Sequence, residues 1–129
     1  MTGPDAPIGV LLVEDNDVYR ESLVFLLKRI DGLDVLGAVA DGAAATPACL
    51  ELVPDVVVVD FRLPDIDGAE VAADLRERCP WAAVVFLSAS AGQEEYDAAS
   101  SAGAALVRKD EGVDALVGAV RAAAGRRRE

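Results

Sequence analysis

The chain has no histidine among its 129 residues, and this absence removes several kinds of chemistry. Ser-His-Asp and Cys-His nucleophilic machinery and histidine-ligated metal sites all require an imidazole. Cysteine is almost as scarce. Cys49 and Cys79 are too few and too far apart in sequence for a disulfide framework or a Cys-x-x-Cys metal site. We interpret both as buried free thiols on helices.

Basic residues are also few, with 12 Lys and Arg against 23 Asp and Glu, which gives a formal net charge of −11. Nucleic-acid phosphates are held by clustered Lys and Arg, so this balance opposes non-specific binding to DNA or RNA. The one basic cluster is Arg126-Arg127-Arg128. We interpret residues 125–129 as a basic tail or the start of a linker.

Apolar runs are short, and none approaches the ~18 residues that a membrane-spanning helix needs. The N-terminus lacks the basic-then-apolar pattern of a signal peptide, so we predict a cytoplasmic location and no membrane partner. Hydrophobic residues still make up 53% of the chain, which is typical of a folded domain with a core. We assign that domain to residues 8–124. Residues 1–7, with two prolines and a glycine, are expected to be a flexible N-terminus.

Apolar runs and helical patterns alternate five times along the sequence. The clearest strand is Val56–Val59, four β-branched residues typical of a strand buried on both faces of a parallel sheet. This alternation predicts βαβ units with right-handed crossovers. We therefore predict an α/β, flavodoxin-like (βα)5 fold: a five-stranded parallel sheet of order 2-1-3-4-5 with helices on both faces. Expected strands are residues 8–13, 33–40, 56–60, 82–87 and 104–107, and expected helices are 18–30, 43–53, 68–78, 93–102 and from 113 onward.

Acidic residues stand at the carboxyl ends of two predicted strands that are neighbours in this order. Glu14 and Asp15 end the first strand, and Asp60 ends the third. Two carboxylates about 5 Å apart repel by roughly 3 kcal/mol at an effective dielectric constant near 20. Three such pairs would take a large fraction of the ~5–15 kcal/mol that stabilises a domain. A hard cation would relieve the repulsion, and oxygen-only ligands favour Mg²⁺.

Two further polar side chains are expected at the same edge. Ser88 ends the fourth predicted strand, and Lys109 follows the fifth. Either residue alone is most simply a turn residue or a solvated charge. With the acids and a metal, however, they provide what phosphoryl transfer onto a carboxylate needs. The carboxylate attacks, the metal and the lysine hold phosphoryl oxygens, and the hydroxyl orients one of them.

These segments resemble the receiver domain of bacterial two-component response regulators over nearly the whole chain. The most specific motif is Asp-x-x-Leu-Pro-x-x-Asp-Gly, which occupies residues 60–68 directly after a hydrophobic strand. The other matching segments are Val13-Glu14-Asp15, Leu87-Ser88-Ala89 and Val107-Arg108-Lys109.

The resemblance implies a phosphorylated switch. Asp60 would accept a phosphoryl group from a cognate histidine kinase, and Ser88 and Lys109 would bind the phosphoryl oxygens. The domain would catalyse only its own phosphorylation and dephosphorylation, so we predict a signalling domain and not an enzyme. The Mg²⁺ ligands would be Glu14, Asp15, Asp60 and the backbone carbonyl of Arg62.

The resemblance also implies how the signal leaves the site. Movement of Ser88 and Lys109 would shift the loops around helix 93–102, the least apolar helix. Its surface with the fifth strand and the last helix would then control homodimerisation or an output domain for transcription regulation. Leu106 is a departure, because family members usually carry Tyr or Phe there as a rotamer switch. Its usual coupling to Ser88 is therefore in question.

Three segments resemble the NarL/LuxR-type subfamily: Lys109-Asp110, residues 15–23 and residues 119–125. Regulators of that type follow the receiver with a helix-turn-helix domain. Contact with DNA is expected only through such a C-terminal domain, which these residues do not include. The chain is expected to be either a truncation at the linker or a stand-alone receiver.

Other phosphate-handling classes lack residues that they need. A haloacid-dehalogenase-type phosphohydrolase requires a second aspartate two positions after its nucleophile, where this chain has Arg62. The P-loop motif is absent. A flavodoxin would need a hydroxyl-rich phosphate loop where Glu14 and Asp15 stand. The alternative that stays open is an atypical receiver that acts as a protein-interaction adaptor without phosphorylation.

Overall fold

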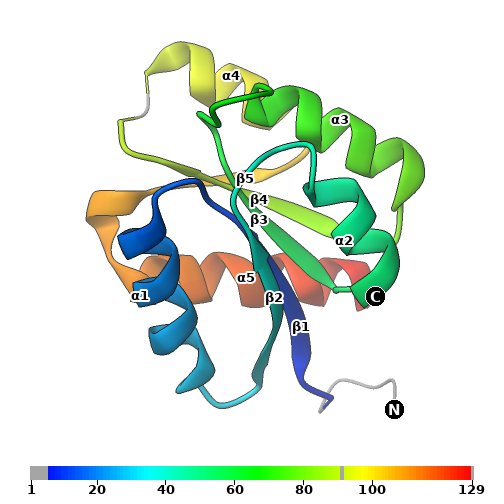
Figure 1. The fold of residues 1–129 in the computed structure, drawn as a ribbon, viewed down its shortest axis with the longest axis vertical. Helices are drawn as coiled ribbons and strands as arrows, with labels where there is room; N and C mark the ends of the chain where they lie inside the picture. The colour runs from blue at the N-terminus through cyan, green and yellow to red at the C-terminus, as the bar shows by residue number, and fades with distance from the viewer. Residues whose placement is uncertain (1–5, 91, 129) are drawn as a thin grey trace.

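The computed structural model describes residues 6–90 and 92–128. These residues form a parallel sheet of order β2-β1-β3-β4-β5 flanked by helices on both sides (Figure 1). The predicted fold class and strand order are therefore confirmed. The strands are β1 (Ile8–Val13), β2 (Leu33–Val39), β3 (Val56–Asp60), β4 (Ala83–Ser88) and β5 (Ala105–Arg108). The helices are α1 (Asp17–Lys28), α2 (Ala45–Leu52), α3 (Gly68–Arg78), α4 (Gln93–Ser101), the 3-10 turn η1 (Lys109–Glu111) and α5 (Val113–Arg128).

The C-terminal residues continue a helix. Helix α5 runs on to Arg128 through a segment rich in alanine and arginine, both good helix formers, and the role of residues 125–129 as a basic tail or the start of a linker stays a prediction. Residue 129 and most of the predicted N-terminal segment, residues 1–5, lie outside the described part of the chain. Within the described ranges, no helix combines the length and apolar character that crossing a bilayer requires.

Strand alternation divides the core between the two faces of the sheet. Val10 and Leu12 of β1 pack with α1 and α5, whereas Leu11 and Val13 pack with α2, α3 and α4. Figure 1 shows the same division, with α1 and α5 on one side of the sheet and the other three helices on the opposite side. All five residues of β3 are buried, as expected of a central parallel strand.

The two cysteines are free and buried, as predicted. Cys49 lies in α2, and Cys79 is the residue that caps the carboxyl end of α3. Burial and the neighbouring Cys79 thiol raise the pKa of Cys49 to about 12. Both thiols therefore belong to the core and lie outside the acidic site described below.

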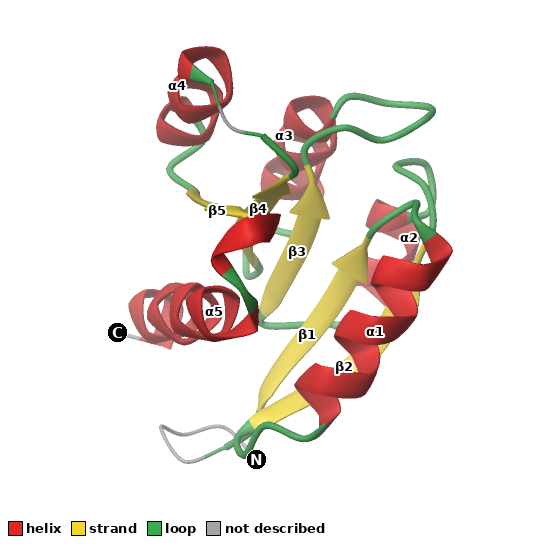
Figure 2. Cartoon of the chain, turned by 90° about the vertical axis from the view of Figure 1, so that its left-hand side faces the viewer, coloured by secondary structure: helices red, strands yellow, loops and turns green. Residues whose placement is uncertain are grey.

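The register of the sheet brings the functional strand ends together. Val13 pairs with Val59, Asp60 pairs with Leu87, and Ser88 pairs with Arg108. The carboxyl ends of β1 and β3 point the same way in Figure 2, so the residues that follow them share one edge. Polar residues that leave these two strands are thereby placed side by side.

Candidate functional site

Three carboxylates meet at the carboxyl ends of β1 and β3. Glu14, Asp15 and Asp60 each offer one oxygen, and these oxygens all lie within 4.8 Å of one another. Glu14 and Asp60 are buried, with 1% and 5% of their surface exposed, while Asp15 faces solvent. The predicted convergence of the three acids is confirmed. At this separation each pair repels by roughly 3 kcal/mol at an effective dielectric constant near 20.

Lys109 partly compensates the acidic charge. Its Nζ lies 2.6 Å from Glu14 Oε1 and 3.3 Å from Asp60 Oδ2. The ammonium also lies 4.5 Å from the centre of the Tyr19 ring, a distance typical of a cation–π contact. Lys109 opens η1 directly after β5, so the edge of the sheet positions it against both buried acids.

The first turn of α1 fixes the orientation of Glu14. The Asn16 backbone N–H donates to Glu14 Oε2 at 3.0 Å, and Arg20 Nη1 donates to the Glu14 carbonyl at 2.9 Å. Asn16 itself caps the helix by accepting from the Tyr19 N–H at 2.9 Å. Sequence reasoning gave no role to Tyr19 or Arg20. Their position at the start of the helix that follows Glu14 and Asp15 was the one sequence feature that could have indicated contact with the acidic site.

The pKa values of the two buried carboxyls move in opposite directions. Burial and the adjacent Glu14 raise the pKa of Asp60 to about 7, against the opposing effects of Lys109 and the Arg62 N–H. Burial opposes ionisation of Glu14 too, but the adjacent Lys109 ammonium and a hydrogen bond from the Asn16 N–H lower its pKa. Burial likewise opposes the Lys109 charge, yet both carboxylates raise its pKa. Asp60 is therefore the member of this pair that takes up a proton as the pH falls toward neutral, while Glu14 remains ionised.

The donor set of this pocket fits a hard divalent cation. Glu14 Oε1 is buried and lacks a well-aligned hydrogen-bond donor among the described residues, although Lys109 Nζ is close. All the side-chain donors are carboxylate oxygens, and the exposed Asp15 leaves one side open to water. Mg²⁺ is a hard cation that prefers oxygen ligands. It also keeps several waters, so a few carboxylates and an open side suffice to bind it. The residues present are therefore compatible with the predicted metal.

The remaining predicted site residues lie beside the pocket in different ways. The Arg62 backbone N–H donates to Asp60 Oδ1 at 3.3 Å, while its carbonyl stays a predicted metal ligand. Ser88 is buried at the end of β4, at the predicted edge, but its hydroxyl donates to the Ser90 carbonyl at 2.6 Å. Its predicted role on the phosphoryl group therefore requires the hydroxyl to leave that bond.

Leu106 lies in β5, opposite Phe86 in the sheet register. It is half-buried and packs against the core cluster on the α2–α3–α4 side. A leucine has no hydroxyl and no aromatic ring, so its contacts here are apolar only. The structure places no polar contact between Leu106 and Ser88 among the interactions of the described residues.

Asp65 is a further residue to which the sequence analysis gave no role. Its two carboxylate oxygens accept from the Gly42 N–H at 2.8 Å and the Ala43 N–H at 2.9 Å. The first of these bonds is the main cause of the lowered Asp65 pKa. The bonds join the loop after β3, which carries the site, to the loop after β2. The position of Asp65 within a turn of the sequence gave no indication that it contacts a loop more than 20 residues away.

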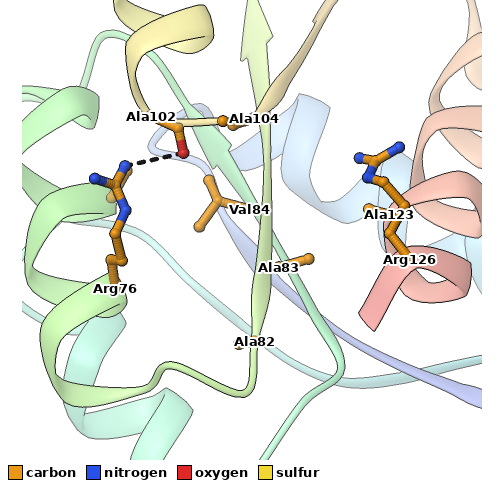
Figure 3. A pocket seen from close by; sticks show the side chains of 10 residues that line it. Arg76, Ala82, Ala83, Val84, Ala102, Ala104, Ala123 and Arg126 are labelled. Carbon is orange, nitrogen blue, oxygen red and sulfur yellow. Dashed lines mark hydrogen bonds between the residues drawn. The ribbon is translucent and has the colours of Figure 1, made fainter. Parts of the chain in front are cut away.

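A cavity of about 290 Å³ lies away from the acidic pocket, near the start of β4 (Figure 3). Alanines and Val84 form much of its lining. Arg76 of α3 reaches across to donate to the Ala102 carbonyl, at the C-terminal end of α4, at 2.9 Å. None of the predicted site residues lines this cavity.

A parallel α/β sheet with an acidic, cation-compatible pocket at its carboxyl edge defines a class of flavodoxin-like domains. Within that class, this chain belongs to the response regulator receiver domain family, whose model matches residues 10–121. The predicted family is thereby confirmed, and the chain is a receiver domain, that is, a signalling domain.

Individual relatives agree with this assignment. The DNA-binding transcriptional activator DevR/DosR of Mycobacterium tuberculosis is 40% identical over 100 residues, which cover 75% of this chain and 45% of that protein. The signal receiver domain of the response regulator NarL from the same species has a TM-score of 0.81 at 30% identity, covering 90% of this chain and 98% of that one. A LuxR-family response regulator from Aurantimonas has a TM-score of 0.87 at 29% identity, covering 93% and 86%.

The resemblance to NarL and LuxR-type regulators is therefore confirmed. The chain spans less than half the length of the first curated relatives that it matches, from 24% to 45%.

Proposed function

We propose that this receiver domain is a phospho-accepting switch in which Asp60 takes a phosphoryl group from a cognate histidine kinase. The observation that carries the proposal is the meeting of Glu14, Asp15 and Asp60 within 4.8 Å, with Lys109 beside them. Such crowding of negative charge opposes folding unless a cation neutralises it, as Lys109 does in part and a bound Mg²⁺ would do further. The backbone N–H of Arg62, two residues further along the chain, donates to Asp60 Oδ1 and so orients the carboxylate that would accept the phosphoryl group.

Each residue has a distinct role in the proposed reaction. An Asp60 oxygen attacks phosphorus while the leaving group departs in line, so the phosphoryl group ends on the carboxylate. Lys109, already 3.3 Å from Asp60 Oδ2, stabilises negative charge on the transferred oxygens, and Ser88 orients one of them. Mg²⁺, held by Glu14, Asp15, Asp60 and the Arg62 carbonyl, would neutralise charge on the phosphoryl group.

The signal is proposed to leave through the surface of α4, β5 and α5. That surface would control homodimerisation or an output domain in transcription regulation, in a cytoplasmic setting. The relative DevR/DosR is a DNA-binding transcriptional activator, which supports a role in transcription regulation. A DNA-binding domain would lie outside the residues described here. The domain would catalyse only its own phosphorylation and dephosphorylation.

The decisive experiment is incubation with acetyl phosphate and Mg²⁺, followed by intact-mass measurement. We expect one added phosphoryl group that is stable in acid and labile in base, as an acyl phosphate is. Asp60→Asn should abolish the addition, and Asp67→Asn, a change in the same loop, should retain it. A wild-type chain with no mass shift would contradict the proposal and favour the adaptor.

A further inference from the structure

We propose that an ion pair between Arg62 and Glu95 holds helix α4 against the phosphorylation loop, and that phosphorylation of Asp60 releases it. The release step rests on the proposed function, whereas the resting contact does not. The pair would give this chain a mechanical link from the acidic site to α4 that does not pass through Leu106.

The contact joins the loop after β3 to the first turn of α4. Arg62 Nη2 lies 2.9 Å from Glu95 Oε1. The two residues are 33 positions apart, so this bond connects two separate elements and not two neighbouring turns. A surface hollow lined by Phe61, Arg62, Glu94 and Glu95, among others, lies where these elements meet.

Glu95 also builds the N-terminus of α4. Its other oxygen, Oε2, accepts from the Gly92 N–H at 2.6 Å, which satisfies one of the donors that a helix start leaves free. The Glu95 side chain is only 8% exposed, although it is charged. Arg62 is the cation that pairs with it among the described residues. The Gly92 N–H is the main cause of the lowered Glu95 pKa, and the Arg62 guanidinium lowers it further.

Helix α4 has little else to hold its first turn. Its buried residues are Glu95 and Ala99, and its largest apolar side chain, Tyr96, is 46% exposed. Elements that bury little apolar surface open at low free-energy cost. The Arg62–Glu95 ion pair is therefore one of few contacts that tie the start of α4 to the loop after β3.

Arg62 is placed to respond to the chemistry at Asp60. Its backbone N–H donates to Asp60 Oδ1 at 3.3 Å, and its side chain is 77% exposed, so the guanidinium can rotate without disturbing the core. Phosphorylation would replace the single negative charge of an ionised Asp60, two residues away, by a phosphoryl group of about −1.5 to −2 charges with three acceptor oxygens. Arginine binds a phosphate through two parallel hydrogen bonds, which are stronger than a single contact with a carboxylate.

Transfer of Arg62 to the phosphoryl group would leave Glu95 buried without its cation. Glu95 would keep its bond from the Gly92 N–H but lose the cation that bridges it to the loop after β3, so the first turn of α4 would be held less firmly against that loop. The phosphorylation state would thus be converted into a change in the order of α4.

The test is hydrogen–deuterium exchange of the α4 backbone, with and without acetyl phosphate and Mg²⁺. Wild-type α4 should exchange about fivefold faster when the chain is phosphorylated. Arg62→Gln should give the faster exchange already in the resting state, with little further change on phosphorylation. Glu95→Gln, which keeps an oxygen for the Gly92 N–H but removes the charge, should behave in the same way.

Arg76→Gln is the matched control, because Arg76 is an exposed arginine that bonds to the opposite end of α4 and does not contact the acidic site. It should retain the wild-type response. Wild-type protection in resting Arg62→Gln would overturn the clamp itself, whatever happens on phosphorylation. A wild-type response of phosphorylated Arg62→Gln would overturn the release step. Absence of phosphoryl uptake by the wild-type chain, measured by mass, would instead overturn the proposed function.

Discussion

At the scale of the residue, Gly68 is a glycine whose Cα lies against backbone and not only against side chains. A Cβ added there would lie 2.7 Å from the Asp60 carbonyl oxygen and 2.8 Å from the Phe61 Cα, both backbone atoms of the site loop. Because backbone cannot rotate aside as a side chain can, Gly68→Ala should lower the free energy of unfolding by about 1–3 kcal/mol. Thermal melting or urea unfolding measures the loss.

Gly118 in α5 provides the control for this change. A Cβ at Gly118 would have no neighbour within 4 Å, and the residue is exposed. Gly118→Ala should therefore raise stability by roughly 0.5–1 kcal/mol through lower chain entropy in the unfolded state. Equal effects of the two substitutions would contradict the close approach of α3 to the site loop.

Asp60 makes stability depend on pH. Burial and Glu14 raise its folded pKa to about 7, above its ordinary value near 3.9. The folded state therefore binds this proton more tightly than the unfolded state. The stability that Asp60 gains from its tighter proton binding is fully present below about pH 4 and is lost as the pH rises through about 7.

Asp60→Asn removes that dependence and should be more stable than the wild type by about 2 kcal/mol at pH 8. The difference should shrink toward pH 5, where Asp60 in the wild type is neutral. Urea unfolding of both chains across this range measures it. A difference that stays constant from pH 5 to pH 8 would show that Asp60 does not carry a raised pKa.

At the scale of the element, hydrophobic periodicity sufficed to predict the strands and helices. The four β-branched valines of β3 favour a buried strand, which the structure shows, and the acids at its end and at the end of β1 lie together as the predicted strand order requires. A run of arginines is compatible in sequence with a solvated tail and with a helix, and α5 continues through residues 126–128, while their role as a tail or linker stays a prediction.

Side-chain contacts between elements could not be predicted in the same way. Glu95 was one acid in a polar helix, and nothing in its sequence neighbourhood points to Arg62, 33 residues earlier. Ser88 was placed correctly at the end of β4, but its hydroxyl direction depends on the Ser90 carbonyl in the following loop. Such details depend on rotamers and loop geometry, which local patterns do not determine.

At the scale of the whole molecule, part of the excess negative charge is concentrated in one pocket. The chain carries a net charge of −11, and three of its carboxylates lie within 4.8 Å of one another beside one lysine. General repulsion on a surface is screened by salt, whereas the buried Glu14–Asp60 pair is screened much less. A specific cation should therefore stabilise the fold more than ionic strength does.

Magnesium binding to these three carboxylates is the claim on which the rest of the account depends. Thermal unfolding at pH 8 with increasing Mg²⁺, at constant ionic strength, measures it most directly. The wild type should gain about 2.7 kcal/mol when Mg²⁺ reaches a hundredfold its Kd. Asp15→Asn, which alters an exposed ligand and leaves the core intact, should gain much less. A wild-type melting curve that does not move with Mg²⁺, or an equal gain in stability of Asp15→Asn, would contradict magnesium binding at this site.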